Sequence, residues 1–185
     1  MIKKYSVKGV DLRTEVIIGV SIIPFFLIFS VLTIWFYHNM TGVEFRNIPF
    51  TITLGGMFSG IVVGLLFARI LGKSMSGIWY IEIQQEDLLI GFKNKIWFVP
   101  LDELSKLKIF GNPGFKYVSI FYQNESIRMR IGNSGLTPFS TDIDLQQLDN
   151  FIKEIQPYLE KHYSKKDGTV KQSPPGTVKL TYFKK

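Results

Sequence analysis

The chain has 185 residues, of which 22 are lysine or arginine and 15 are aspartate or glutamate, giving a formal net charge of +7. This length leaves room for about one compact domain once two long apolar segments are set aside. The absence of cysteine excludes disulfides, thiolate zinc sites and a cysteine nucleophile, and it suits a reducing compartment. The positive charge indicates an anionic partner, and its position along the chain tells more than its sum.

Two apolar runs without a charged side chain occupy the N-terminal third, Val16–Tyr37 and Phe50–Ala68. Each is long enough, at about 1.5 Å per residue, to cross a hydrocarbon core of roughly 30 Å. A cleaved signal peptide is the alternative for the first run, but the run is too long and no small-x-small cleavage site follows it. We therefore expect a transmembrane hairpin over residues 15–72, preceded by a basic cytosolic N-terminus, residues 1–14.

Basic residues flank the two runs. Four precede the first run and two follow the second: Lys3, Lys4, Lys8 and Arg13, then Arg69 and Lys73. The connecting segment His38–Pro49 carries only Glu44 and Arg46 as charged residues. Lysine and arginine near span ends stay in the cytoplasm, so we expect both termini inside and the short loop outside. The prediction is a multi-pass protein of the cell (inner) membrane, with the six flanking basic residues at the membrane surface.

Inside the hairpin, Pro24 should bend the first helix, because it lacks an N–H and its ring crowds the preceding turn. Four small residues at four-residue spacing form a stripe on the second run: Gly56, Gly60, Gly64 and Ala68. Such a stripe lets another helix approach closely. That helix is either the first span of the same chain, a second copy, or another membrane protein. Neither run contains an interior Asp, Glu, Lys or Arg, which argues against transport by this chain alone.

Downstream of Ser76 the apolar period changes from helical to two, which predicts strands. Six segments alternate in this way and are separated by turn residues: 79–83, 88–92, 96–101, 105–110, 115–122 and 127–131. A short piece around Leu136–Phe139 supplies a seventh candidate strand. Together these segments predict an antiparallel sheet.

The next element is predicted to be an amphipathic helix. Asp144 with Gln147 three residues on matches a capping box, and Pro157 should kink or fray the last turns. Five large apolar residues form one stripe at helical spacing: Leu148, Phe151, Ile152, Ile155 and Leu159. Burial contributes roughly 1.5–3 kcal/mol for each of them before entropy is subtracted, so we expect this helix to close the sheet's open end.

Seven short antiparallel strands followed by one helix is the order of a pleckstrin-homology-like (PH-like) barrel. The chain resembles a family of small bacterial membrane proteins that join a two-span N-terminal hairpin to a C-terminal PH-like domain. The likeness covers residues 12–163 and rests on the hairpin, on Gly77–Phe92, on Val99–Leu104 and on Leu136–Leu159. It implies an α+β membrane protein whose seven-stranded barrel, residues 76–163, is closed by a C-terminal helix. The resemblance implies no defined biochemical role.

PH domains that hold phosphoinositides use basic residues in the first hairpin loop. The loop expected at that place here, Gln84–Asp87, is acidic and would repel a phosphorylated headgroup. We therefore do not expect stereospecific inositide binding.

The tail, residues 164–185, contains six lysines and one acid, Asp167. It could be a disordered basic segment lying on anionic lipid. It could instead add strands to the barrel edge, because Val178, Leu180 and Tyr182 alternate. A solvated end without a function is the third alternative.

No residue pattern predicts catalysis, a cofactor or a metal. His38 lies in the outer loop and His162 near the helix end, so both are expected at the surface. Asp142 and Asp144 are expected to cap the helix rather than bind a divalent ion. Two pairs of basic residues, Lys106/Lys108 and Arg128/Arg130, project from outer faces of the sheet. Without exposed aromatics beside them they do not predict nucleic-acid binding.

These features predict a membrane-anchored, cytosol-facing PH-like interaction or scaffold module without catalytic activity. Its partners would be the lipid bilayer and a protein or peptide that could add a strand at an open barrel edge. A homo-oligomer is a further possibility. One alternative is an immunity-type membrane protein that neutralises a toxin. Another is an accessory subunit of a larger membrane complex, docked through the small-residue stripe.

Overall fold

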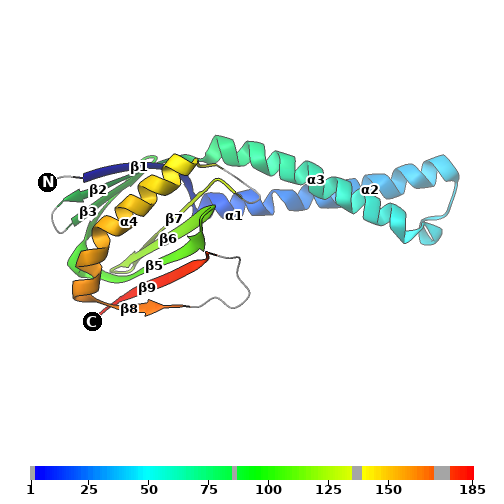
Figure 1. The fold of residues 1–185 in the computed structure, drawn as a ribbon. Helices are drawn as coiled ribbons and strands as arrows, with labels where there is room; N and C mark the ends of the chain where they lie inside the picture. The colour runs from blue at the N-terminus through cyan, green and yellow to red at the C-terminus, as the bar shows by residue number, and fades with distance from the viewer. Residues whose placement is uncertain (1–2, 85–86, 135–138, 169–175) are drawn as a thin grey trace. The chain divides into compact units, whose positions relative to one another are not determined.

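The computed structural model describes residues 3–84, 87–134, 139–168 and 176–185. The chain forms two compact units (Figure 1). Arg13–Ser74 make up the helical unit, and Met1–Leu12 together with Met75–Lys185 make up the sheet unit. The chain is α+β, with two long apolar helices and a nine-stranded antiparallel sheet.

The helical unit contains α1 (Leu12–Val20), α2 (Ile22–Thr41), the 3₁₀ turn η1 (Phe45–Asn47) and α3 (Phe50–Met75). The segments Leu12–Thr41 and Phe50–Met75 are both long and apolar enough to cross a membrane. The break between α1 and α2 falls at Ser21. Pro24 has no N–H to donate to the carbonyl of Val20, four residues earlier, which explains the break and agrees with the predicted bend.

The small-residue stripe of α3 is buried against α2. A Cβ added at Gly56 would lie 2.6 Å from the hydroxyl oxygen of Thr33, and one at Gly60 would lie 2.7 Å from the carbonyl oxygen of Phe25. Glycine at these positions therefore lets the two helix backbones approach closely. Of the three helices that the sequence left open for this stripe, the structure places the first span of the same chain against it.

The sheet unit contains nine strands, whereas the sequence predicted seven. Their bounds are β1 (Lys3–Asp11), β2 (Gly77–Gln84), β3 (Asp87–Phe92), β4 (Lys95–Pro100), β5 (Leu104–Asn112), β6 (Phe115–Tyr122), β7 (Glu125–Gly132), β8 (Tyr163–Asp167) and β9 (Val178–Lys184). The 3₁₀ turn η2 (Leu101–Glu103) joins β4 to β5. The strand order is β4-β3-β2-β1-β7-β6-β5-β9-β8. Within the described residues β4 and β8 are free ends of the sheet, so the expected closed barrel is wrong.

The N-terminal segment is a central strand of this sheet. The division of the chain into a basic N-terminus (1–14) and a separate domain (76–163) therefore needs correction. Residues Lys3–Gly9 of β1 pair with β2, from Lys3↔Ile83 to Gly9↔Gly77. Val10 and Asp11 pair instead with β7, so β1 links the two halves of the sheet. Gly9 marks the change of partner, and a Cβ there would lie 2.5 Å from the carbonyl oxygen of Arg130.

The helical unit is inserted between two paired strands. Leu12, the first residue of α1, follows Asp11 directly, and only Ser76 separates α3 from β2. Because Gly9 and Gly77 are paired, both connections leave the same end of the sheet. We call this the insertion end.

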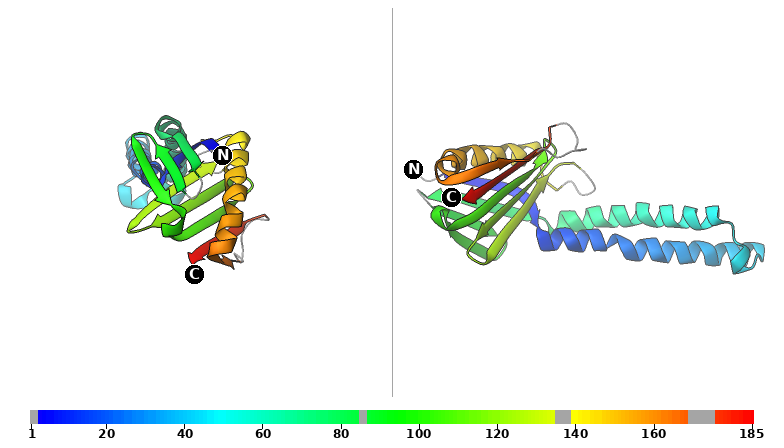
Figure 2. Two further views of the ribbon diagram at one scale, coloured as in Figure 1. Left: turned by 90° about the vertical axis from the view of Figure 1, so that its left-hand side faces the viewer. Right: turned by 90° about the horizontal axis from the view of Figure 1, so that it is seen from below.

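Helix α4 (Asp142–His162) covers the inner face of the bent sheet (Figure 2). Thr141 is its N-cap and forms a capping box with Asp144, so the box lies three residues before the predicted one. Asp144 Oδ1 accepts the backbone N–H of Lys8 at 2.7 Å, and Gln147 Oε1 accepts that of Ser6 at 3.1 Å. Ser6 and Lys8 do not pair with β7, and the start of α4 supplies the hydrogen-bond acceptors for their backbone N–H groups.

The core lies between α4 and the sheet. Four residues of the predicted stripe are buried, as is Leu145, whereas Ile152 is only half-buried. They pack on inward strand residues that include Trp79, Ile120 and Met129. The helix continues past Pro157 to His162, so Pro157 does not end it.

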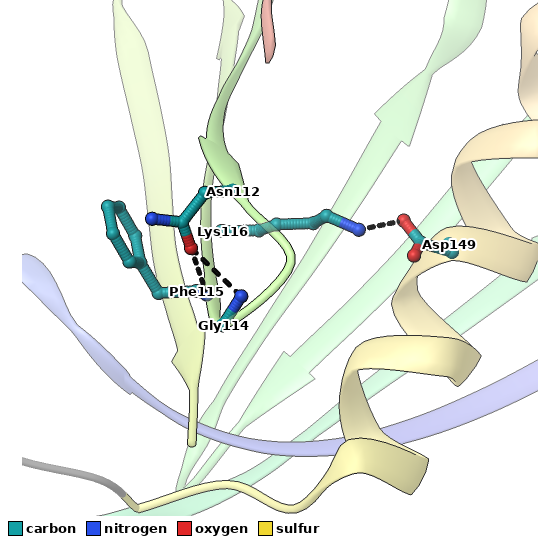
Figure 3. A network of polar contacts seen from close by, with 5 residues as sticks. All are labelled: Asn112, Gly114, Phe115, Lys116 and Asp149. Carbon is teal, nitrogen blue, oxygen red and sulfur yellow. Dashed lines mark hydrogen bonds and ion pairs between the residues drawn. The ribbon is translucent and has the colours of Figure 1, made fainter. Parts of the chain in front are cut away.

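A polar contact also ties α4 to the second half of the sheet (Figure 3). The ammonium group of Lys116 on β6 forms an ion pair with Asp149 of α4. The neighbouring turn is closed by Asn112 Oδ1, which accepts the backbone N–H groups of Gly114 and Phe115 at 2.8 and 3.1 Å. This is an Asx-type turn, which fixes the register of the β5–β6 hairpin.

The tail adds strands, which was the second of its three predicted forms. β9 pairs with β5, from Lys106↔Phe183 to Gly111↔Val178, and β8 pairs with β9. Tyr182 is buried in the core. Most of the predicted seventh strand around Leu136–Phe139 lies outside the described residues, and Phe139 itself is not in a strand.

Candidate binding surfaces

The outer face of β1–β4 contains an apolar depression of about 360 Å³. Gly91 of β3 lies between its pairing partners Tyr80 on β2 and Ile96 on β4. A Cβ at Gly91 would lie 3.7 Å from the Cβ of Tyr80, which is ordinary van der Waals contact, so a side chain could be added here without a clash. Tyr80 and Ile96 form the walls of the depression, and both side chains are exposed.

Strand β4 carries large apolar residues at the open edge of the sheet. Ile96 is 73% exposed and Phe98 is 53% exposed. Among the residues that the structure describes, no strand pairs with the edge of β4 that faces away from β3. An open edge with exposed apolar side chains is a ready template for an added strand.

The far rim of the depression is polar and internally paired. Lys4 on β1 forms an ion pair of 3.1 Å with Glu82 on β2. Gln84 Nε2 donates a hydrogen bond of 2.8 Å to the other carboxylate oxygen of Glu82. The hydrogen bond from Gln84, followed by the contact with Lys4, lowers the pKa of Glu82 below its usual value. Lys4 and Glu82 therefore balance each other on this rim, whereas Lys93 and Lys95 add positive charge to the lining of the depression.

The outer face of β9, β5, β6 and β7 has a different chemistry, and we call it the basic face. Strand register places Lys108 of β5 and Arg128 of β7 on either side of Ser119 of β6. One row further, Lys106 pairs with Phe121 on one side and with Phe183 on the other. No carboxylate forms an ion pair with Lys106, Lys108 or Arg128 in the described part of the chain.

Aromatic rings lie directly among these cations. The ammonium groups of Lys106 and Lys108 lie 6.0 and 5.6 Å from the centre of the Phe121 ring, and the Arg128 guanidinium lies 5.6 Å from it. Lys106 is also 4.7 Å from the Phe183 ring. The sequence predicted no exposed aromatics beside these basic residues, and the two rings that lie there, Phe121 and Phe183, are half-buried. The charge of Lys106, followed by burial and by Arg128, lowers the pKa of Lys108.

The six predicted membrane-surface residues divide into two groups, three in strand β1 and three in the helices α1 and α3. Lys3 and Lys4 are strand residues that form ion pairs with Glu154 and Glu82. Lys8, also in β1, is hydrogen-bonded through its backbone to α4. Arg13 is in α1, and Arg69 and Lys73 are in the last turns of α3.

The two histidines and Asp144 make local contacts. No group of three or more His, Asp or Glu side chains could hold a metal ion within the described ranges. His38 Nδ1 lies 2.8 Å from the carbonyl oxygen of Val43, and the ring of His162 lies 4.6 Å from that of Tyr158. Asp144 accepts hydrogen bonds in the capping box of α4.

No protein-family model, curated protein or solved structure matches the chain. The case for a function therefore depends on the two outer faces and on the inserted helices.

Proposed function

We propose that the protein is a membrane-anchored interaction module whose inserted helical unit crosses the bilayer twice. The pairing of β1 with β2 supports this arrangement, because both ends of the helical unit must then lie on one side of the membrane. Apolar side chains such as Leu27, Val31 and Phe58 are mostly exposed on the helices. Lipid would remove this apolar surface from water.

The basic residues around the insertion end favour a cytosolic sheet unit in a cell (inner) membrane. Lys8 and Arg13 precede or begin the first helical segment, and Arg69 and Lys73 end the second. Only Glu44 and Arg46 are charged in the loop at the other end. This asymmetry is the one that orients membrane proteins with their basic side in the cytoplasm.

The order of elements supports a PH-like domain with a helical insertion. Four strands (β1–β4), three strands (β5–β7) and then α4 follow one another, and the first four are joined to the last three through β1. When β1 and β2 are matched to the first two strands of a PH domain, the helical unit takes the place of the first hairpin loop. The acidic sequence Gln84–Asp87 then falls between the second and third strands, so it no longer bears on inositide binding.

The partner we propose is an extended segment of another protein with apolar side chains at alternate positions. The observation that carries this proposal is the exposure of Ile96 and Phe98 on the open edge of β4, beside the depression at Gly91. Lys93 and Asn94 form a two-residue turn, so hydrogen bonds to β3 should alternate from Lys95 onward. The N–H groups of Ile96 and Phe98 would then point to the free edge.

Site-specific photo-crosslinking in the native cell tests this function. A photoreactive phenylalanine at Phe98 should give a discrete adduct with one protein, and Ile96→Pro should abolish it by removing an edge donor. The same probe at Asn150, exposed on α4, is the matched control and should give no such adduct. Equal adducts at both positions, or an adduct unaffected by Ile96→Pro, would contradict the proposal.

This function requires no catalytic residue, so we propose a role without enzymatic activity. Docking of an accessory subunit through Gly56, Gly60 and Gly64 is less favoured, because α2 already covers that stripe.

A further inference from the structure

We propose that the basic face binds the anionic headgroups of the same bilayer that the helices cross. The face is defined by Lys106, Lys108 and Arg128, with Phe121 and Phe183 among them. This surface is separate from the depression and from the edge of β4, so the proposal does not depend on the peptide partner.

The cluster is electrostatically unbalanced. Its three cations surround one ring, and no carboxylate pairs with them in the part of the chain that the structure describes. The lowered pKa of Lys108 reflects this mutual repulsion. A bound phosphate group would relieve it by supplying the missing negative charge.

Strand register brings the cluster close to the point where the chain enters the helical unit. Arg130 on β7 pairs with Val10, two residues before α1 begins at Leu12. Arg128 is therefore within roughly 10 Å of Leu12, given ordinary strand spacings. Lys108 lies two strands further across the sheet.

The length of the first helical segment places Leu12 at headgroup depth. The uncharged run begins at Val16, four residues after Leu12, which corresponds to about 6 Å along a helix. Because no linker separates β1 from α1, the sheet unit cannot move far from the bilayer surface. Anionic headgroups are thus the source of phosphate nearest to the basic face.

The aromatic residues favour lipid over nucleic acid. Base stacking needs a free ring face, whereas three cations lie around the ring of Phe121. Aromatic rings beside basic side chains are instead common at the membrane–water interface. The experiment below therefore distinguishes nucleic-acid binding from lipid binding.

The test uses the full-length chain in nanodiscs made of phosphatidylcholine, with or without phosphatidylglycerol. A bimane probe is attached to Ser126→Cys, whose strand partner is Phe121, and lipid with a nitroxide headgroup serves as quencher. Because the chain has no cysteine, this label is unique. We expect added phosphatidylglycerol to increase quenching several-fold and high salt to reverse the increase. A probe at Asn150→Cys on α4 should not respond.

Two double variants then test the residues. Lys108→Gln/Arg128→Gln should remove the phosphatidylglycerol dependence, whereas Lys153→Gln/Lys161→Gln on α4 removes the same charge and should retain it. Unchanged dependence in the first variant, or equal quenching in both lipids, would overturn the proposal. A response of the Ser126→Cys probe to single-stranded RNA in phosphatidylcholine nanodiscs, lost in Phe121→Ala, would also overturn it and assign the face to nucleic acid. Unfolding curves of both variants exclude misfolding as the cause.

Discussion

The outer faces of the two halves of the sheet follow the same alternation but carry different chemistry. On β2–β4 the outward residues include Tyr80, Ile96 and Phe98, with a depression at Gly91. On β5–β7 they include Lys106, Lys108 and Arg128, which approach one another without an acidic partner among the described residues. Buried apolar residues of both halves form one hydrophobic core together with those of α4. The inner face therefore explains folding, and the contrast between the outer faces fits the two different partners that we propose for them.

The largest effect should come from the shared core beneath both faces. Phe151 of α4 is fully buried and its ring lies 5.8 Å from that of Tyr5 on β1. Phe151→Ala should lower the free energy of unfolding of the sheet unit by about 3–5 kcal/mol, because it leaves a cavity. Denaturant unfolding of the full chain in detergent measures this. A loss below about 1 kcal/mol would show that α4 is not packed as described.

High pH should weaken the second half of the sheet through Tyr163. Its buried hydroxyl donates to the carbonyl oxygen of Leu101, and burial raises its pKa to about 12. Since the unfolded pKa is about 10, the folded state holds this proton more tightly, and its contribution is present below pH 10. About 2–3 kcal/mol should be lost as the pH rises from about 10 to 12. Unfolding curves of Tyr163→Phe should lack this component; identical pH profiles would contradict the assignment.

Filling the depression should separate binding from stability. In Gly91→Leu the new side chain would enter the depression, with its Cβ in ordinary van der Waals contact with the Cβ of Tyr80 at 3.7 Å. We expect stability to stay within about 1 kcal/mol of the parent chain, because a strand glycine is replaced by an apolar residue. The crosslink from Phe98 should nevertheless be lost. A retained crosslink would show that the partner does not use the depression.

The smallest effect should come from relieving repulsion on the basic face. Lys108→Gln removes a cation whose pKa is lowered chiefly by Lys106. We expect a slight rise in Tm at low salt that disappears at high salt. Ile96→Gln on the other outer face is the matched control and should show no salt dependence. A fall in Tm for Lys108→Gln would indicate that an unrecognised acidic partner holds Lys108.

Six strands between Gly77 and Gly132 were predictable because their apolar residues alternate over short distances. Strand β1 was not predicted. Its three lysines resemble the flanking charges of a membrane span, and its partner β2 begins 66 positions after β1 ends. The inward side chains of Tyr5 and Val7 were the available signal. The C-terminal strand β9 could be offered only as an alternative, since its partner β5 is equally distant in sequence.

The basic face shows why the sequence alone did not predict the candidate binding surfaces. Lys106, Lys108 and Arg128 were recognised as outward residues, but Phe121 belongs to the strand between them. Only the register of β5, β6 and β7 places its ring beside the three cations. The depression at Gly91 depends in the same way on cross-strand neighbours, Tyr80 and Ile96. Sequence periodicity assigns a residue to a face, whereas register decides what lies next to it.

The membrane insertion of the helical unit is the central claim, and cysteine accessibility in intact cells tests it most directly. Single cysteines at Asn39, next to the loop between the long helices, and at Ser126 in the sheet unit are exposed to a membrane-impermeant maleimide. If the helices cross the membrane as proposed, Asn39→Cys is labelled in intact cells and Ser126→Cys only after permeabilisation. Labelling of Ser126→Cys in intact cells, or recovery of the protein in the aqueous fraction without detergent, would contradict it.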